Sequence, residues 1–240
     1  MKRFLALILA LSITLGITAC GESNNSSETQ TENGSVNVTE DNDAGEGTQE
    51  ADDENEPAAD NSPITEDDVR NHAETPASDF EYVDHGDNVS IKAYNGSDPI
   101  VVIPEQIDGK DVVGITDGPF TNDSFVKGIS LPSTIKELEW TFGNNAALQV
   151  VLASGVETVG EGTFVNNTAL KVVDLGENLT VFNESNYFEK GVEKLYIPAG
   201  VTELNKYMFL GGTDNLTIVG EAGSYAETYA NENGFNFEVR

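Results

Sequence analysis

The sequence predicts a β-rich repeat solenoid over its last two thirds, preceded by a region that does not fold. Phenylalanines recur at intervals of 22, 22, 24 and 21 residues, at Phe120, Phe142, Phe164, Phe188 and Phe209. Each unit also contains one short alternating run that reads as a strand, such as Ile129–Leu131. A unit of about 22 residues with one strand is too small to bury its own apolar side, so the units must stack.

Two further apolar registers keep the same period. One has intervals of 21, 23 and 22 residues, and the other has intervals of 23, 21, 23 and 22. They comprise Leu131, Leu152, Leu175 and Ile197, and Ile115, Leu138, Val159, Phe182 and Leu204. Because the three sets of apolar residues repeat with the same period, they predict a parallel sheet along one face of the stack and a hydrophobic core that runs through all units. We expect a local bulge or a weaker stack between Phe142 and Leu152, where the repeat is one residue short. We also expect an irregular unit from Phe182 to Tyr187.

The start of the chain predicts a lipoprotein signal. Lys2 and Arg3 precede the apolar run Phe4–Ala19, which ends at Cys20, the single cysteine of the chain. A basic start, a short apolar stretch and small residues before the cut are typical of a secretory signal. Ile-Thr-Ala-Cys resembles a bacterial lipobox, so we expect residues 1–19 to be removed and Cys20 to be lipidated. The alternative is an ordinary cleaved signal with a leftover cysteine.

Lipidation at Cys20 predicts where the protein is found. A thioether diacylglycerol carries two acyl chains, which is about what stable membrane anchoring requires. We therefore expect the protein at the extracellular face of the bacterial cell membrane, as a secreted and lipid-anchored protein. The sequence favours an envelope with one membrane, but Gly21 after the lipidated cysteine is also compatible with sorting to an outer membrane.

Residues 20–79 are predicted to be the lipidated cysteine followed by a disordered acidic linker. From Gly21 to Asp79 there are 18 acidic residues and one basic residue, Arg70. Their isolated apolar side chains cannot bury enough surface to offset the entropy of ordering the segment. About 60 such residues span roughly 40 Å, which suits a tether, although a passive solubility tail has the same composition. Thr65 with Asp68 could cap a helical turn, which we expect to fray without an apolar face.

Residues 80–240 form the predicted folded domain, with repeats at about 99–220 and a cap at each end. At the front, residues 80–98 contain two alternating runs around a Gly-Asp-Asn turn and predict a β-hairpin. At the back, residues 221–240 predict a short helix followed by a strand. Ser224 is the expected N-cap of that helix and Gly234 its stop.

The repeat region resembles the BspA-like leucine-rich repeat family of bacterial surface proteins. The segments Ile129–Leu138, Leu195–Leu204 and Gly223–Gly234 carry the resemblance, which covers roughly residues 80–240. The resemblance implies a leucine-rich-repeat solenoid and a role in adhesion or recognition, and says almost nothing of the ligand. The family commonly has Cys three residues after the phenylalanine, where this chain has Asp123, Asn145 and Asn167. We expect these three side chains to bond loop backbone.

No enzyme and no cofactor are predicted. Residues 80–240 contain one histidine, His85, which lies in a turn. No serine or cysteine stands in the context of a nucleophile with its base, there is no zinc-ligand set, and no Gly-rich phosphate loop follows a strand. The formal charge of −30 excludes a non-specific nucleic-acid binder, since phosphate contacts need clustered basic side chains.

Calcium is the one metal for which the sequence offers candidates. Asp84, Asp87 and Asn88 are the nearest thing to an oxygen-ligand loop. They lack the spacing of an EF-hand, so they are weak candidates. Most of the 24 acidic residues between 80 and 240 are expected to form a solvated face.

The predicted function is a membrane-anchored module for protein–protein or cell-surface binding. We expect the strand face to be the binding face, with Ser130, Asp174 and Tyr196 pointing outward. The negative field predicts a protein or glycan partner that is basic or bridged by calcium. Two alternatives stay open: a structural envelope lipoprotein without a discrete ligand, and a wall hydrolase that uses a carboxylate pair.

Overall fold

The structure is a computed structural model that describes residues 62–183, 186–205, 207–209 and 215–240. All of these residues fall in one compact unit, Ala58–Arg240. The predicted signal peptide, Cys20 and residues 21–61 lie outside the described residues, so their assignment stays a prediction. In the described part, no helix combines the length and the apolar character needed to cross a membrane.

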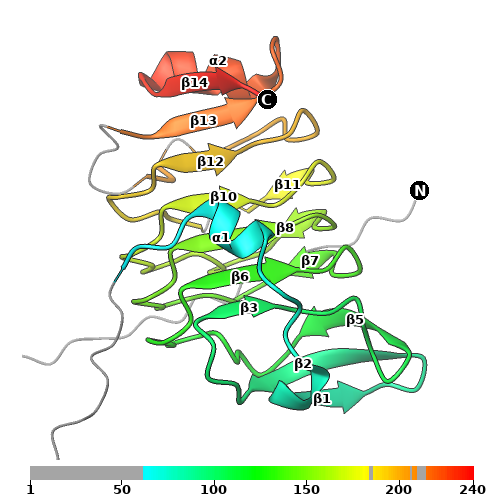
Figure 1. Ribbon diagram of the computed structural model, residues 1–240. Coiled ribbons are helices and arrows are strands. Elements are labelled where there is room, and N and C mark those ends of the chain that lie inside the picture. The colour runs from blue at the N-terminus through cyan, green and yellow to red at the C-terminus, as the bar shows by residue number, and fades with distance from the viewer. Residues whose placement is uncertain (1–61, 184–185, 206, 210–214) are drawn as a thin grey trace, which may run out of the picture. The chain divides into compact units, whose positions relative to one another are not determined.

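The long sheet runs along one side of the solenoid and takes one strand from each turn (Figure 1). Its strand order in the described residues is β14-β13-β12-β10-β8-β6-β3, and every neighbouring pair is parallel. The strands are β3 (Ile100–Val102), β6 (Gly128–Leu131), β8 (Val150–Ala153), β10 (Val172–Asp174), β12 (Lys194–Tyr196), β13 (Thr217–Gly220) and β14 (Asn236–Val239). This topology confirms the predicted leucine-rich-repeat solenoid.

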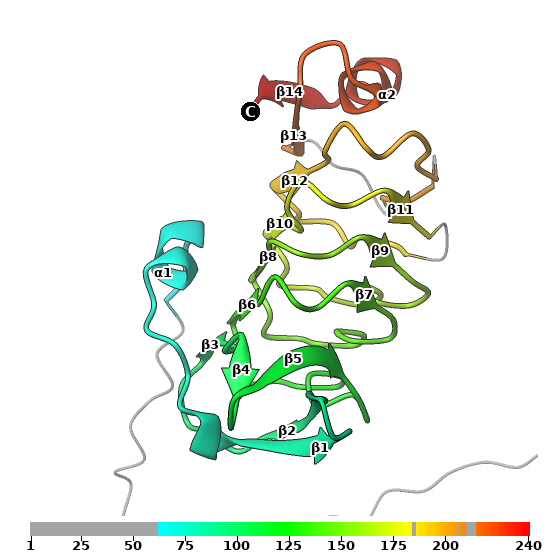
Figure 2. The same ribbon diagram turned by 90° about the vertical axis from the view of Figure 1, so that its right-hand side faces the viewer.

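A short parallel sheet lies on the opposite side of the turns (Figure 2). It is made by β7 (Glu137–Leu138), β9 (Thr158–Val159) and β11 (Val181–Phe182). The inward side chains Leu138, Val159 and Phe182 of these strands are buried. The predicted register that contains these three residues therefore lines the second side of the core.

The front cap is a four-stranded sheet of order β1-β2-β5-β4. It comprises β1 (Phe80–Asp84), β2 (Asn88–Tyr94), β4 (Gln106–Ile107) and β5 (Lys110–Ile115), and it follows the 3-10 turn η1 (Ala77–Asp79). β1 and β2 pair antiparallel, which confirms the predicted hairpin. β4 and β5 also pair antiparallel, through a turn in which Asp108 and Gly109 both have positive φ.

The back cap is the helix α2 (Tyr225–Asn233) followed by β14. The Ser224 hydroxyl accepts a hydrogen bond from the Glu227 backbone N–H, and Gly234 ends the helix at φ 75°. Both the predicted N-cap at Ser224 and the predicted helix end at Gly234 are confirmed. Tyr229 of α2 is buried, so the helix closes the last turn of the core.

A column of aromatic rings forms the centre of the solenoid. Phe120, Phe142, Phe164 and Phe188 are each at most 1% exposed, and the centroids of successive rings are 6.3, 5.8 and 5.4 Å apart. These spacings lie in the range that favours offset or tilted packing of aromatic pairs. The column continues into both caps through Phe80, Tyr94, Phe209 and Phe235.

The strand register differs from the predicted one at Leu152. Ser130 pairs with Leu152, and Leu131 pairs with Ala153, so Leu152 points to the outer face of the long sheet. The β6–β8–β10 ladder runs without a register shift, and the expected bulge is therefore wrong. A slip of one residue moves a side chain to the other face, and the core position equivalent to that of Leu131 is held by Ala153 instead. The irregular unit expected from Phe182 to Tyr187 includes residues 184–185, which lie outside the described residues.

The polar residues that replace cysteine in the repeat bond loop backbone, as predicted. Asn145 and Asn167 are buried, and the Asn145 Nδ2 donates to the Phe120 carbonyl at 3.3 Å. The Asn145 backbone N–H donates to Oδ1 of Asn167 in the next unit at 3.2 Å. Asp123 accepts from the backbone N–H of Val126. These bonds tie the loops of successive units together.

The folded part begins earlier than predicted. Residues 62–79 are part of the packed structure, with the helix α1 at Glu66–Arg70. The expected cap is confirmed, because Thr65 and Asp68 form a reciprocal capping box. The expectation of fraying is wrong, because Val69 is only 1% exposed and packs on the repeats. The predicted disordered linker therefore does not extend to residue 79, since residues 62–79 belong to the packed structure.

The aromatic column gives a stability test. We expect Phe142→Ala to lower the free energy of unfolding by about 3–5 kcal/mol, because it leaves a cavity between two rings. Phe125→Ala is the control, since Phe125 is 46% exposed, and its effect should stay within about 0.5 kcal/mol. Urea denaturation followed by circular dichroism measures both. Equal losses in the two variants would show that the column does not hold the units together.

Candidate binding surface

The three residues predicted to form a binding face share one row of the long sheet. Ser130 of β6 pairs with Leu152 of β8, and Leu152 pairs with Asp174 of β10. The strand of Asp174 in turn pairs with β12, which contains Tyr196. Because alternate side chains of a strand point to opposite faces, this whole row points away from the core. The structure therefore brings the predicted residues together on the outer face of the long sheet.

That outer face is covered in part by a segment of the same chain. Residues 62–75, here called the strap, run across the long sheet and include α1 (Figures 1 and 2). Ile64 and Val69 of the strap pack against an apolar patch. The patch consists of Ile100, Val150, Leu152 and Val172. The outward-pointing Leu152 therefore has its apolar partners in the strap.

A glycine leaves the space into which the apolar side chains of the strap pack, here called the seat of the strap. A Cβ atom at Gly128 would lie 2.6 Å from both the Ile64 Cδ1 and the Val69 Cγ2. Such a separation is far below van der Waals contact, so the two apolar side chains fit only because this strand position has no side chain. Gly128 lies in β6, beside the patch residues of β3 and β8.

A buried carboxylate holds the end of α1. The Asp174 side chain is 4% exposed, and its Oδ2 accepts from Arg70 Nη2 at 2.8 Å. Arg240 donates to the Oδ1 of the same carboxylate at 3.3 Å, and the Gly176 backbone N–H donates to it at 3.0 Å. Asp174 is therefore a buried anchor with two guanidinium partners, and not a free contact residue. A buried charge of this kind becomes costly when a partner is removed.

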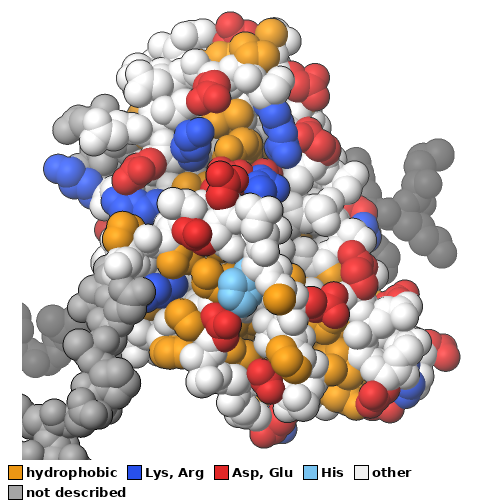
Figure 3. All heavy atoms as spheres, viewed as in Figure 1, with side chains coloured by type: hydrophobic (Ala, Val, Ile, Leu, Met, Phe, Trp, Pro, Cys, Tyr) orange, Lys and Arg blue, Asp and Glu red, His pale blue; other side chains and the backbone are white. Residues whose placement is uncertain are grey.

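Tyr196 is also engaged by the strap. Its hydroxyl donates to the Glu66 Oε2 at 3.0 Å, and the Arg240 guanidinium carbon lies 5.3 Å from its ring centroid. Burial, together with the hydrogen bond to Glu66, raises the pKa of Tyr196 to about 12. The phenol thus stays protonated and acts as a donor to the strap. Figure 3 shows this face, with acidic and basic side chains close together above the apolar area.

Backbone bonds fix the two ends of the strap. The Ile64 N–H donates to the side-chain carbonyl of Gln149 at 3.0 Å. At the other end, the Thr75 N–H donates to the Val102 carbonyl, and the Val102 N–H donates to the Thr75 Oγ1, both at 2.9 Å. Val102 belongs to β3, the end strand of the long sheet. The strap therefore satisfies part of an otherwise open sheet edge.

Ser130, the third predicted residue, is also half-buried beside the strap. It lines a hollow of about 220 Å³ together with Arg70, Leu152 and Ser154. The sequence-based interpretation missed the strap itself. Arg70, the one basic residue of the acidic segment, was a signal that could have been used, because an isolated base among acids calls for a carboxylate partner.

The weak calcium candidates are not brought together as an open site. Lys110 Nζ lies 2.7 and 2.6 Å from the two Asp84 carboxylate oxygens. The hydrogen bonds from Lys110 and from the Gly86 N–H lower the pKa of Asp84. Lys110 is therefore bound to the Asp84 carboxylate, which would otherwise be the calcium ligand beside Asp87 and Asn88. In the described part of the chain, no group of three or more His, Cys, Asp or Glu could hold a metal ion.

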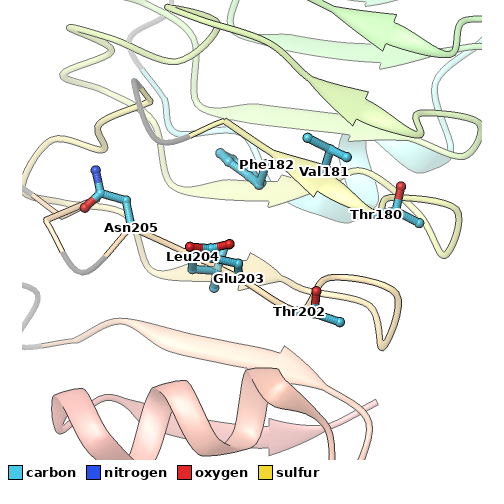
Figure 4. A pocket seen from close by; sticks show the side chains of 7 residues that line it. All are labelled: Thr180, Val181, Phe182, Thr202, Glu203, Leu204 and Asn205. Carbon is cyan, nitrogen blue, oxygen red and sulfur yellow. The ribbon is translucent and has the colours of Figure 1, made fainter. Parts of the chain in front are cut away.

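A separate hollow of about 370 Å³ lies where the short sheet ends (Figure 4). Beyond β11, the segment Thr202–Asn205 of the next turn does not continue the sheet, and the hollow opens between the two. Its lining is Thr180, Val181, Phe182, Thr202, Glu203, Leu204 and Asn205. The lining contains one carboxylate and no histidine, so it assembles neither a nucleophile with its base nor a carboxylate pair.

Comparison with known families identifies the repeats. Residues 101–216 match the family described as BspA type Leucine rich repeat region, in 6 copies. These repeats are BspA-type leucine-rich repeats. Stacked repeats of this kind present an extended surface that suits protein recognition.

Among solved structures, the chain is similar to the one titled "Crystal structure of T. pallidum Leucine Rich Repeat protein (TpLRR)", with 19% identity and a TM-score of 0.38. The match covers 69% of this chain and 98% of that chain. No curated protein matches the sequence.

The seat of the strap on the BspA-type repeats gives a second prediction. Gly128→Val should push Ile64 and Val69 off the sheet, and Val69→Ala should weaken the same contact. We expect amide hydrogen exchange in residues 66–70 to rise at least tenfold in both variants, while exchange in the long sheet stays slow. Val113→Ala, at a position 38% exposed on β5, is the matched control. Unchanged exchange in Gly128→Val would show that the strap is not held at this seat.

A third prediction concerns alkaline pH. The folded pKa of Tyr196 is about 12 and its ordinary value is 10, so its contribution to strap docking is complete below pH 10 and is lost as the pH rises to about 12. The difference in tyrosinate absorbance between the unchanged chain and Tyr196→Phe isolates this residue. Glu66→Gln should lower the pKa of Tyr196, because it removes the nearby negative charge. An unchanged transition in Glu66→Gln would contradict the assigned hydrogen bond.

Proposed function

We propose that this chain is a lipid-anchored protein of the bacterial cell surface whose BspA-type repeats bind another protein in adhesion or recognition. Three features support the proposal: the lipobox-like sequence ending at Cys20, the acidic segment that precedes the strap, and the outer face of the long sheet. The acidic segment would hold the repeats away from the membrane. The repeats would then present the long sheet to neighbouring molecules.

One observation carries the proposal: the outer face of the long sheet already holds a peptide segment. The strap is bound there by an apolar seat at Gly128, by the Asp174 carboxylate and by the Tyr196 hydroxyl. It also bonds the edge of β3 through Thr75. A surface with these four kinds of contact has what is needed to bind an extended or helical segment of another protein.

The partner is proposed to be basic, or to be bridged by calcium. The chain has a formal charge of −30, and the resulting field attracts cationic surfaces and repels acidic ones. A partner that docks on the long sheet must share the face with the strap or displace it. Displacement costs the contacts of the strap, so variants that weaken the strap but leave the residues of the long sheet unchanged should bind such a partner more tightly.

A binding panel tests the proposal. The purified Cys20→Ala chain is tested against matrix proteins, mucins and wall glycans, with and without calcium and at rising salt. We expect saturable binding to at least one protein, weakened by salt, and at least tenfold weaker in Tyr196→Ala. Glu232→Ala, an exposed change on α2, is the control. Val69→Ala weakens the strap and leaves the seat at Gly128 open, so it should bind more tightly where the partner uses that seat.

Three outcomes of this panel would contradict the proposal. Absence of saturable binding would favour a structural envelope role. Release of sugars from wall glycan that is lost on a single Asp or Glu change would favour a hydrolase. Binding that is equal in Tyr196→Ala and in the control would mean that the long-sheet face is not the contact surface.

The anchor is tested separately in cells. We expect the unchanged chain to incorporate labelled fatty acid and to sediment with membranes, and Cys20→Ala to lose both, because the thiol is the proposed site of lipidation. Ser23→Ala, three residues later, should behave like the unchanged chain. Fatty-acid labelling that persists in Cys20→Ala would refute the lipobox interpretation.

A further inference from the structure

A tryptophan replaces a glycine of the repeat at one position. Gly118, Trp140 and Gly162 stand two residues before Phe120, Phe142 and Phe164 of the aromatic column. All three residues have left-handed backbone, with φ of 62°, 49° and 62°. Glycine adopts this conformation readily, whereas a bulky residue there is a rare outlier. Trp140 occupies the position without being buried, since it is 56% exposed, so packing in the core does not account for it.

The indole has a defined seat beside the end of β7. A Cβ atom at Gly162 would lie 2.2 Å from the indole Cε3 and 2.3 Å from Cζ3, so the six-membered ring rests against bare backbone. The Trp140 backbone N–H donates to the Glu161 carbonyl at 2.9 Å, and the Thr121 hydroxyl donates to the Trp140 backbone carbonyl at 2.8 Å. The tryptophan is thus held by the units on both sides.

A groove opens on the other side of Trp140, toward Gly118. Its volume is about 600 Å³, and Thr116, Asp117, Asn122 and Glu139 line it together with the tryptophan. Among the described residues that line it there is no Lys, Arg or His. Neither Asp117 nor Glu139 forms an ion pair with any residue in the described part of the chain. The groove therefore combines an exposed aromatic ring with two carboxylates that lack a cationic partner.

We propose that this groove binds a Lys or Arg side chain of a protein partner. A cation is attracted to the face of an indole, and the two carboxylates supply the acceptors that an ammonium or guanidinium group needs. The inference rests on the proposed recognition function and adds to it the chemistry of one contact. The groove lies beside β7 of the short sheet, so it is separate from the long-sheet face that the strap covers.

The single tryptophan makes the site directly measurable, because Trp140 is the only one in the chain. The full chain is titrated with a capped tri-arginine peptide, with the neutral tri-citrulline peptide and with a chitin oligosaccharide, and the tryptophan fluorescence is recorded. We expect a saturable change with tri-arginine that weakens as salt increases, and at least tenfold weaker binding of tri-citrulline. A saturable change with the sugar alone, or none with tri-arginine, would overturn the proposal.

Matched variants separate the groove from the general negative field. Asp117→Asn with Glu139→Gln keeps the fluorophore and should weaken tri-arginine binding at least tenfold. Asp87→Asn with Glu232→Gln removes the same charge at exposed positions elsewhere and should leave binding nearly unchanged. Equal losses in the two double variants would show that only the overall charge is sensed, and would overturn the proposal.

Trp140→Gly gives a variant that is expected to fold. It restores the glycine of the neighbouring units at a positive φ, so we expect an unchanged or raised melting temperature, with loss of tri-arginine binding in calorimetry. Binding that survives Trp140→Gly would overturn the groove proposal. If a partner found in the panel binds Trp140→Gly as well as the unchanged chain, the groove proposal fails and the recognition function stands. If tri-arginine binds and the panel yields no partner, the recognition function fails and the groove stands.

Discussion

The structure depends on the contact between one phenylalanine ring and the ring of the next unit. A unit of about 22 residues has no second layer to cover its apolar side, so each ring is buried only when a neighbour stacks on it. The rings of Phe120, Phe142, Phe164 and Phe188 form that stack, and the two caps extend it. Because the column must be continuous, the long and short sheets follow it on either side. The side chains of Asn145 and Asn167 bind loop backbone groups of the preceding unit.

The features on which both proposals rest lie where the chain departs from its own repeat. A regular unit buries its inward side chains and leaves polar ones outward, which gives the surface little to distinguish it. Leu152 and Gly128 depart on the long sheet, and together they make an apolar seat with room for the strap. Trp140 departs on the opposite side, where neighbouring units have glycine. Such departures from a local rule are expected at functional sites, since nothing in the packing of the repeat requires them.

The strap connects the acidic segment to the outer face of the long sheet. Its docking joins residues 104 and 130 positions apart, at Arg70 with Asp174 and Glu66 with Tyr196. A segment held by one small helix opens at a lower free energy than the repeats unfold, because it contributes few of the buried apolar contacts. The surface that the strap covers can therefore be exposed without loss of the solenoid. This arrangement also explains the burial of Asp174, which a free strand face would leave in solvent.

The sequence by itself determined the period of the repeat, the order of the caps and the loop-bonding asparagines, because these depend on spacing and on local hydrogen bonding. It also predicted that Ser130, Asp174 and Tyr196 share one face, since strand alternation is a local rule. The tertiary structure decided the side on which Leu152 lies, because a one-residue change of register inverts every contact of a strand. It also decided the docking of the strap and the exposure of Trp140. Those features arise from contacts between distant residues, and no periodicity in the sequence records them.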